Sequence, residues 1–250
     1  MGIHLLDTRI VLVRPRNPLN IAAAARAMRN CGLQDLVLVA AYEPVWLDAR
    51  AAPGAKDLLR NARVVPRLLD ALDDRRLVLG TSSLARRRPS QPVVPLDRLS
   101  GLLKQRKASG RLAILFGSEK TGLSNQDLGH CHAVLQIPTE QRAPTMNLGQ
   151  AVAVCCYELS RCLKTDRGKP QEAYRPTAAS PATVGEVNRL VAAVERLLDE
   201  DSRAEAGATR GRGTQLRELF LRCPLTSRDV TRLLGVLRDL AWRMRQRIES

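Results

Sequence analysis

Short apolar segments alternate with longer segments of helical pattern over the first two thirds of the chain. The apolar segments predict buried strands at residues 9–13, 36–39, 77–80, 113–116 and 133–137, with a short strand at 64–65 and an extended segment at 89–95. Helices are predicted between them at residues 21–29, 51–59, 67–72, 96–107 and 147–163. Because strands and helices alternate, the expected fold is α/β, a mostly parallel sheet with helices on both faces.

Two polar residues mark expected helix starts. Asn20 precedes an alanine-rich run of high helix propensity, so it is the expected N-cap of the helix at 21–29. Ser227 is the expected N-cap of a long amphipathic helix whose apolar residues run from Val230 to Ile248.

The last third of the chain has a different character. Residues 164–182 are rich in Lys, Arg, Pro, Thr and Ser and predict a linker. Helical spacing returns at residues 184–198, 215–221 and 227–248, which predicts a small helical extension. The expected division is therefore an α/β domain at 1–163, a linker at 164–182 and a helical extension at 183–250. The extension packs on itself, on the main domain or on a partner chain, and its basic face contacts RNA or only water.

Net charge narrows the expected partners. The chain carries 40 Lys and Arg residues, most of them arginine, against 25 acidic residues, for a net charge of +15. Arginine presents a planar fork that suits phosphate, so a polyanion such as RNA is the expected partner. A high-GC genome is the alternative source of so many arginines. Aromatic residues make up only 3%, which argues against a surface that stacks many single-stranded bases.

Several classes of protein are disfavoured. No segment approaches the length of a membrane span, and residues 1–7 lack the pattern of a signal peptide, so the cytoplasm is the expected compartment. The six cysteines show no metal-like spacing, and no metal is expected. His4, His130 and His132 lack the partners of a hydrolase triad. Phosphate-binding G-x-x-x-x-G-K-[ST] and dinucleotide-binding G-x-G-x-x-G motifs are absent from the sequence.

Candidate ligand-binding loops follow three of the predicted strands. Thr81, Ser82 and Ser83 come after the strand at 77–80, and Gly117 and Glu119 come after the strand at 113–116. A third loop runs from Ile137 through residues 144–148 into the next helix. The carboxyl ends of parallel strands meet at one edge of a sheet, where α/β proteins bind small molecules. Three ordinary turns are the alternative reading.

Arginines gather near the same edge. Arg14 and Arg16 lie in the loop after the first strand, and Arg26 and Arg29 lie three residues apart on the following helix. They form either a phosphate-facing surface or a solvated basic helix. Residues 86–88 are three consecutive arginines, which are either an exposed loop or a phosphate clamp.

Three ordered motifs carry a resemblance to a known family. Residues 17–21 with Arg26, residues 116–123, and residues 137–148 resemble the three motifs of SPOUT-class RNA 2′-O-ribose methyltransferases. The chain most resembles the TrmJ-like branch, bacterial enzymes that methylate a cytidine or uridine in the tRNA anticodon loop. The resemblance spans nearly the whole chain, including the helical extension.

The resemblance implies a trefoil knot within about residues 113–163, bound S-adenosylmethionine, and a homodimer whose two sites lie at the interface. The helix at 147–163 is the expected interface element. The residues that the resemblance assigns to cofactor binding are Thr81, Ser82, Ser83, Gly117, Glu119, Ile137, Pro144, Thr145, Met146, Asn147 and Leu148. The residues expected to bind RNA are Arg14, Arg16, Asn20, Arg26, Arg29 and Arg87.

The resemblance also implies roles in methyl transfer. Arg26 would stabilise the alkoxide that develops at the 2′-hydroxyl, or would only anchor a phosphate. Arg86 would grip the phosphate beside the acceptor ribose. Thr145 stands where the family commonly has Ser, Ala22 replaces a usual Gly, and Pro144 replaces a small polar residue.

The expected reaction is 2′-O-methylation of a pyrimidine ribose in tRNA, at nucleotide 32 by family resemblance. The alternatives are methylation of another RNA, such as ribosomal RNA, and a non-catalytic RNA-binding relative on the same fold.

Overall fold

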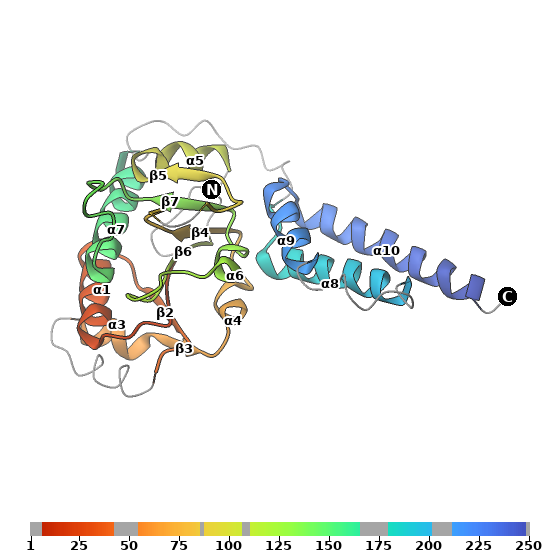
Figure 1. Ribbon diagram of the computed structural model, residues 1–250, viewed down its shortest axis with the longest axis horizontal. Coiled ribbons are helices and arrows are strands. Elements are labelled where there is room, and N and C mark those ends of the chain that lie inside the picture. Colours follow the sequence, from red (N-terminus) through yellow and green to blue (C-terminus); the bar gives the residue numbers. More distant parts are fainter. Residues whose placement is uncertain are drawn as a thin grey trace.

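The computed structural model describes residues 7–42, 55–85, 88–106, 111–165, 180–201 and 212–248. One parallel sheet has the strand order β3-β2-β1-β6-β4-β7-β5 (Figure 1). Its strands are β1 (Thr8–Val13), β2 (Asp35–Val39), β3 (Arg63–Val65), β4 (Leu77–Thr81), β5 (Val93–Pro95), β6 (Leu112–Phe116) and β7 (Ala133–Gln136). The predicted parallel sheet is confirmed, and the extended segment near residue 93 is its edge strand β5.

The two faces of the sheet carry separate apolar cores. Ile10 and Leu12 of β1 belong to one core, and Val11 and Val13 belong to the other, because successive side chains of a strand alternate between faces. Residues of α1 (Pro18–Asn30), α3 (Lys56–Asn61), α5 (Leu99–Gln105) and α7 (Leu148–Thr165) fill the first core. Residues of α4 (Leu68–Leu72) and α6 (Asn125–Leu128) fill the second. The expectation of helices on both faces is confirmed.

The strand order brings three predicted ligand loops together. Strand β4 lies between β6 and β7, so the segments that follow these three strands leave the sheet side by side at its carboxyl edge. Strand β7 in turn lies between β4 and β5, although it follows both along the chain.

Three details of the helices differ from the sequence predictions. The N-cap of α1 is Asn17, whose Oδ1 accepts a hydrogen bond from the Leu19 N–H at 2.9 Å, whereas Asn20 lies inside the helix and is 9% exposed. Thr226, not Ser227, caps α10 (Ser227–Ile248), since its hydroxyl accepts from the Asp229 N–H. The helix expected at 51–59 begins at residue 56, and residues 51–54 lie outside the described part of the chain.

The residues at 180–201 and 212–248, named here the C-terminal module, form a small core of their own. Helices α8 (Val184–Asp201), α9 (Arg212–Arg222) and α10 pack around Val187, Leu190 and Leu221. Figure 1 shows α8 and α9 beside the part of the α/β domain that carries α4 and α6, and α10 extending away from it. Within the described residues, no helix is long and apolar enough to cross a membrane.

Candidate functional site

The Glu119 carboxylate joins the loop after β6 to the start of α1. Its Oε2 accepts the N–H of Arg16 at 2.9 Å, and its Oε1 accepts the N–H of Asn17 at 3.0 Å and the Asn20 Nδ2 at 2.9 Å. Burial raises the pKa of Glu119, but the bonds from Asn20 and the backbone outweigh burial and leave the pKa below its ordinary value. The carboxylate is therefore charged at neutral pH and occupied by protein donors.

Asn20 continues this chain of bonds to the third motif. Its Oδ1 accepts a hydrogen bond from Asn147 Nδ2 at 2.9 Å. The Asn147 Oδ1 accepts the N–H of Gly149 at 2.9 Å, which caps the start of α7. We call Glu119, Asn20 and Asn147 the motif lock, because they connect all three sequence motifs through side chains.

Close packing of α1 on α7 reinforces the motif lock. A Cβ atom on Gly149 would lie 2.7 Å from the Cβ of Ala23, closer than real side chains approach. The absence of a side chain at this position lets the two helices meet. The position of α1 relative to the loops after β6 and β7 is therefore fixed from two directions.

Arg26 and Arg29 lie on the exposed side of α1, while Ile21, Ala25 and Met28 face the core. Among the described residues, none forms a hydrogen bond or salt bridge with the Arg26 guanidinium. Arg16 is also exposed, and only its backbone N–H is engaged by the motif lock. The edge therefore presents a guanidinium on a rigidly held helix.

Arg14 has a protein partner. Its guanidinium forms an ion pair with Asp127 of α6, whose carboxylate also accepts the N–H of Ser124 at 2.6 Å. Arg14 adopts a positive φ of 51° at the end of β1. Burial raises the pKa of Asp127, and the bonds from Arg14 and Ser124 more than offset this, so the pKa is lowered. Arg86 and Arg87 lie outside the described residues.

Two polar groups in the loop after β4 form hydrogen bonds with neighbouring strands. The Thr81 hydroxyl donates to the Leu115 carbonyl at 2.9 Å, and the Ser82 N–H donates to the Leu135 carbonyl at 3.2 Å. These bonds tie the loop to β6 and β7. Ser83 follows half-buried.

Gly117 makes a close approach within its own loop. A Cβ at this position would overlap the backbone of Gly122 and Leu123, so the chain turns back on itself directly after β6. Gly122 has a φ of +66°, which glycine adopts without strain. Gly117 therefore serves a sharp turn after β6.

The loop after β7 is the most exposed of the three. Ile137 is half-buried against the core, and the Pro144 carbonyl accepts the Thr139 hydroxyl at 3.2 Å. Thr145 and Met146 are exposed, and Leu148 is buried at the start of α7. The loop thus offers both polar and apolar groups beside the loop after β4.

Sequence reasoning placed the three motifs at one edge but missed how they bond to each other. It assigned Glu119 and Asn147 to the cofactor, while their side chains bond to protein groups here. It also missed Asp127, although Ser124 and Asp127 have the spacing of a capping box. The cofactor and RNA assignments of the individual residues remain predictions.

Comparison with known proteins identifies the class to which this parallel sheet and its three linked motifs belong. Residues 7–157 match the SpoU rRNA methylase family, so the chain belongs to this family. The family membership expected from the motifs is confirmed.

Two curated relatives and one solved structure align over most of the chain. The tRNA (cytidine/uridine/adenosine-2′-O-)-methyltransferase TrmJ of Pseudomonas aeruginosa (strain UCBPP-PA14) is 35% identical over 237 residues, 92% of both chains. The tRNA (cytidine/uridine-2′-O-)-methyltransferase TrmJ of Sodalis glossinidius (strain morsitans) is 33% identical over 94% of this chain and 92% of its own. The crystal structure of TrmJ from Z. mobilis ZM4 superposes with a TM-score of 0.76 at 29% identity, over 94% of this chain and 99% of that one.

Proposed function

We propose that the protein transfers a methyl group from S-adenosylmethionine to the 2′-hydroxyl of a pyrimidine ribose in the tRNA anticodon loop. Family membership supports an RNA-methylating enzyme, and the two aligned relatives are named as tRNA 2′-O-methyltransferases. The motif lock is the observation that carries the proposal. It holds the helix of Arg26 against the loops that follow β6 and β7.

The loops at the carboxyl edge fit the cofactor in chemical character. S-adenosylmethionine has an apolar adenine face and polar ribose and amino-acid groups. Ile137 and Met146 supply apolar surface, and Ser83 and Thr145 supply hydroxyls, on segments that leave adjacent strands. When bound, the cofactor supplies an electrophilic methyl group, while the chain orients it toward the acceptor.

Arg26 is the proposed catalytic residue. A guanidinium held beside the 2′-hydroxyl stabilises the negative charge that develops on the oxygen during in-line displacement. Because α1 is tied to the other two motifs, this charge is positioned before RNA binds. In the same proposal Arg86 holds the phosphate next to the acceptor ribose, and Thr145 orients cofactor or substrate.

The proposal extends to the architecture around the site. The predicted knot within residues 113–163 is supported by β7 lying between two earlier strands. The predicted homodimer is supported by large apolar side chains exposed on α1 and α7, where Leu19 is 73% and Tyr157 is 65% exposed. The expected compartment is the cytoplasm, where its tRNA substrate resides. The proposed domains remain 1–163 and 183–250, joined by 164–182.

A methyl-transfer assay tests this function. Purified protein is incubated with labelled S-adenosylmethionine and, separately, unmodified tRNA and ribosomal RNA, followed by nuclease digestion and analysis of resistant 2′-O-methyl dinucleotides. Label in a pyrimidine-containing dinucleotide from tRNA is the expected result. Label in ribosomal RNA alone would support 2′-O-methylation but would make ribosomal RNA the substrate, the RNA that the family's description names. No label and no cofactor binding would indicate a non-catalytic RNA-binding relative.

A further inference from the structure

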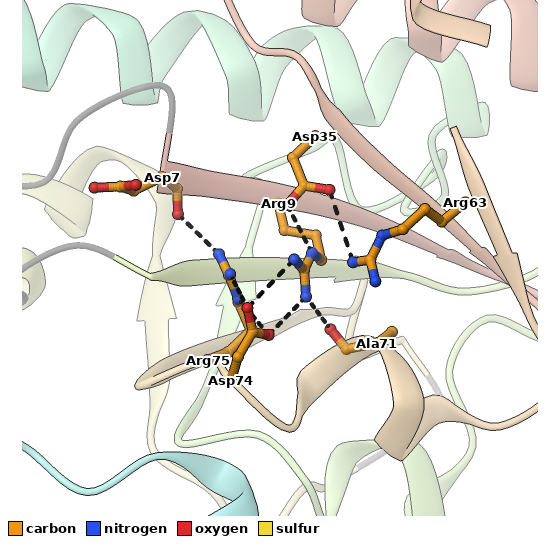
Figure 2. Close-up of polar contacts among 7 residues, drawn as sticks. All are labelled: Asp7, Arg9, Asp35, Arg63, Ala71, Asp74 and Arg75. Atoms are coloured by element: carbon orange, nitrogen blue, oxygen red, sulfur yellow. Dashed lines mark hydrogen bonds and ion pairs between the residues drawn. The ribbon is translucent and has the colours of Figure 1, made fainter. Parts of the chain in front are cut away.

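A partly buried ion-pair network lies at the amino edge of the sheet, where β1 begins (Figure 2). The Arg9 side chain is 8% exposed, and it donates to Asp35 Oδ2 and to Asp74 Oδ1, both at 2.8 Å. Arg75, equally buried, donates from Nε to Asp74 Oδ1 at 3.0 Å. Asp74 therefore joins two guanidiniums that come from different parts of the chain.

This network holds the turn at residues 73–75, which connects α4 to β4. Asp74 is its middle residue, and the guanidinium of Arg75 also donates to the Asp7 carbonyl at 3.1 Å. The side chains of Asp74 and Arg75 are thus bound to the start of β1. The backbone carbonyls of the turn are left to accept hydrogen bonds from other segments. Two of those carbonyls accept hydrogen bonds from the C-terminal module.

The start of α8 binds to these carbonyls. The Val184 N–H donates to the Arg75 carbonyl at 2.8 Å, and the Gly185 N–H donates to the Asp73 carbonyl at 3.0 Å. The first N–H groups of a helix have no acceptor within the helix, so the turn satisfies two of them. The Val184 side chain is 1% exposed and belongs to the core of the α/β domain.

Gly185 permits this approach. A Cβ at residue 185 would lie 2.8 Å from the Asp73 carbonyl oxygen and would overlap the Asp73 side chain. The side chain of Asp73 can rotate away, but its carbonyl belongs to a turn that the ion-pair network holds. A larger residue at 185 therefore has to separate α8 from the turn.

A second contact lies on α9. Gln91 Nε2 donates to Glu218 Oε1 at 3.3 Å, and Gly129 packs beside the Thr214 methyl group. The C-terminal module therefore contacts the α/β domain at two places. Two contacts restrict its rotation relative to the domain as well as its separation from the domain.

We propose that residues 73–75 are a docking platform that fixes the C-terminal module on the α/β domain, and that this fixed placement sets how the module's arginines meet tRNA. Arg228, Arg232, Arg238 and Arg243 are exposed along α10, which extends away from the domain in Figure 1. Several exposed guanidiniums on one helix suit the phosphates of an RNA. The tRNA part of this inference rests on the proposed function, whereas docking itself does not.

Two glycine variants of the full-length chain test the platform. Gly185→Ala introduces the clash with Asp73, and Gly235→Ala is the matched control, because a Cβ at residue 235 of α10 meets no atom within 4 Å. Hydrogen exchange of peptides that cover residues 183–187 reports docking. The KM for full-length tRNA, the kcat at saturating tRNA and the Kd for S-adenosylmethionine report function.

We expect Gly185→Ala to speed exchange at 183–187 without changing exchange in the central strands. Its KM for tRNA should rise roughly tenfold, because a tethered module has a lower effective concentration than a docked one. Its kcat and cofactor Kd should stay within about twofold of the unaltered protein, and Gly235→Ala should match the unaltered protein in every measurement.

Two results would overturn the inference. Unchanged exchange in Gly185→Ala would show that Gly185 does not control docking. Faster hydrogen exchange at 183–187 with an unchanged KM for tRNA would show that docking of the module does not affect tRNA binding. If the unaltered protein methylates no tRNA while Gly185→Ala still speeds exchange, the proposed function fails and the docking platform stands.

Discussion

Arg9 and Arg75 at the amino edge of the sheet differ in burial and in pairing from Arg26 at its carboxyl edge. At the amino edge, Arg9 and Arg75 are buried, and both bind the carboxylate of Asp74. At the carboxyl edge, Arg26 is exposed, and the nearby carboxylate of Glu119 bonds to backbone N–H groups and Asn20 rather than to an arginine. A paired buried cation supports the fold, because an unpaired one there is costly. An exposed cation on a fixed helix is available to a phosphate or a developing oxyanion.

The sharpest test of this contrast is Arg26→Ala. We expect a loss of kcat of roughly 10²-fold or more, the size typical for removing an oxyanion-stabilising donor. Cofactor Kd and melting temperature should not change, since no described residue bonds to this guanidinium. Arg60→Ala on α3 is the control, because Arg60 is also exposed but lies on a helix without a motif. Normal turnover of Arg26→Ala would remove Arg26 from the mechanism.

Acid should destabilise the fold through two buried histidines, His130 and His132. Burial, with smaller effects from Arg217 and Arg106, lowers the pKa of His130 and of His132 to about 4. The unfolded chain binds these protons at pH values below about 6.5, so stability falls as pH drops from about 6.5 toward 4. At pH 5 each histidine should cost about 2 kcal/mol of unfolding free energy.

Urea unfolding between pH 4 and 7 measures this slope, and His130→Leu should reduce it. The Nδ1 atom of His130 is buried without a hydrogen-bond partner among the described residues, so the substitution removes no bond at that atom. An unchanged slope in His130→Leu would show that His130 is not the titrating group.

Gly149→Ala tests whether the placement of α1 matters for catalysis. The new Cβ would meet Ala23 one turn before Arg26, so α1 must shift away from α7. We expect roughly a tenfold loss of kcat, because small displacements of a catalytic group are costly. Gly101→Ala on α5 is the matched control, since a Cβ there meets nothing within 4 Å. Equal kcat values for the two variants would mean that the contact between α1 and α7 does not position Arg26.

The smallest expected effect comes from the amino edge. Asp74→Asn removes the charge that Arg9 and Arg75 share, and should lower the free energy of unfolding by about 1 kcal/mol. This is less than for a wholly buried pair, because the Asp74 side chain is about half exposed. The kcat at saturating tRNA should not change. Asp97→Asn, at an exposed and loosely paired carboxylate, should leave stability unaltered in the same urea titration.

Local pattern was sufficient for most of the fold. The apolar runs located six of the seven strands, and the extended segment that contains β5 was recognised without a strand assignment. The motifs also located the three loops that the strand order then brings together. These features depend on neighbours in the chain, whose side chains alternate or recur with the period of a strand or helix.

The sequence by itself thus determined the alternation of elements, the family and the residues that gather at the carboxyl edge. Tertiary structure alone decided which of those residues bond to one another. Glu119 takes its partners from the start of α1, about a hundred residues away, and that contact makes Asn20 a buried link rather than a helix cap. Arg9 likewise finds Asp74 only because β1 and the turn before β4 meet in space. Hydrogen bonds and ion pairs between distant segments follow from packing, which no short-range pattern encodes.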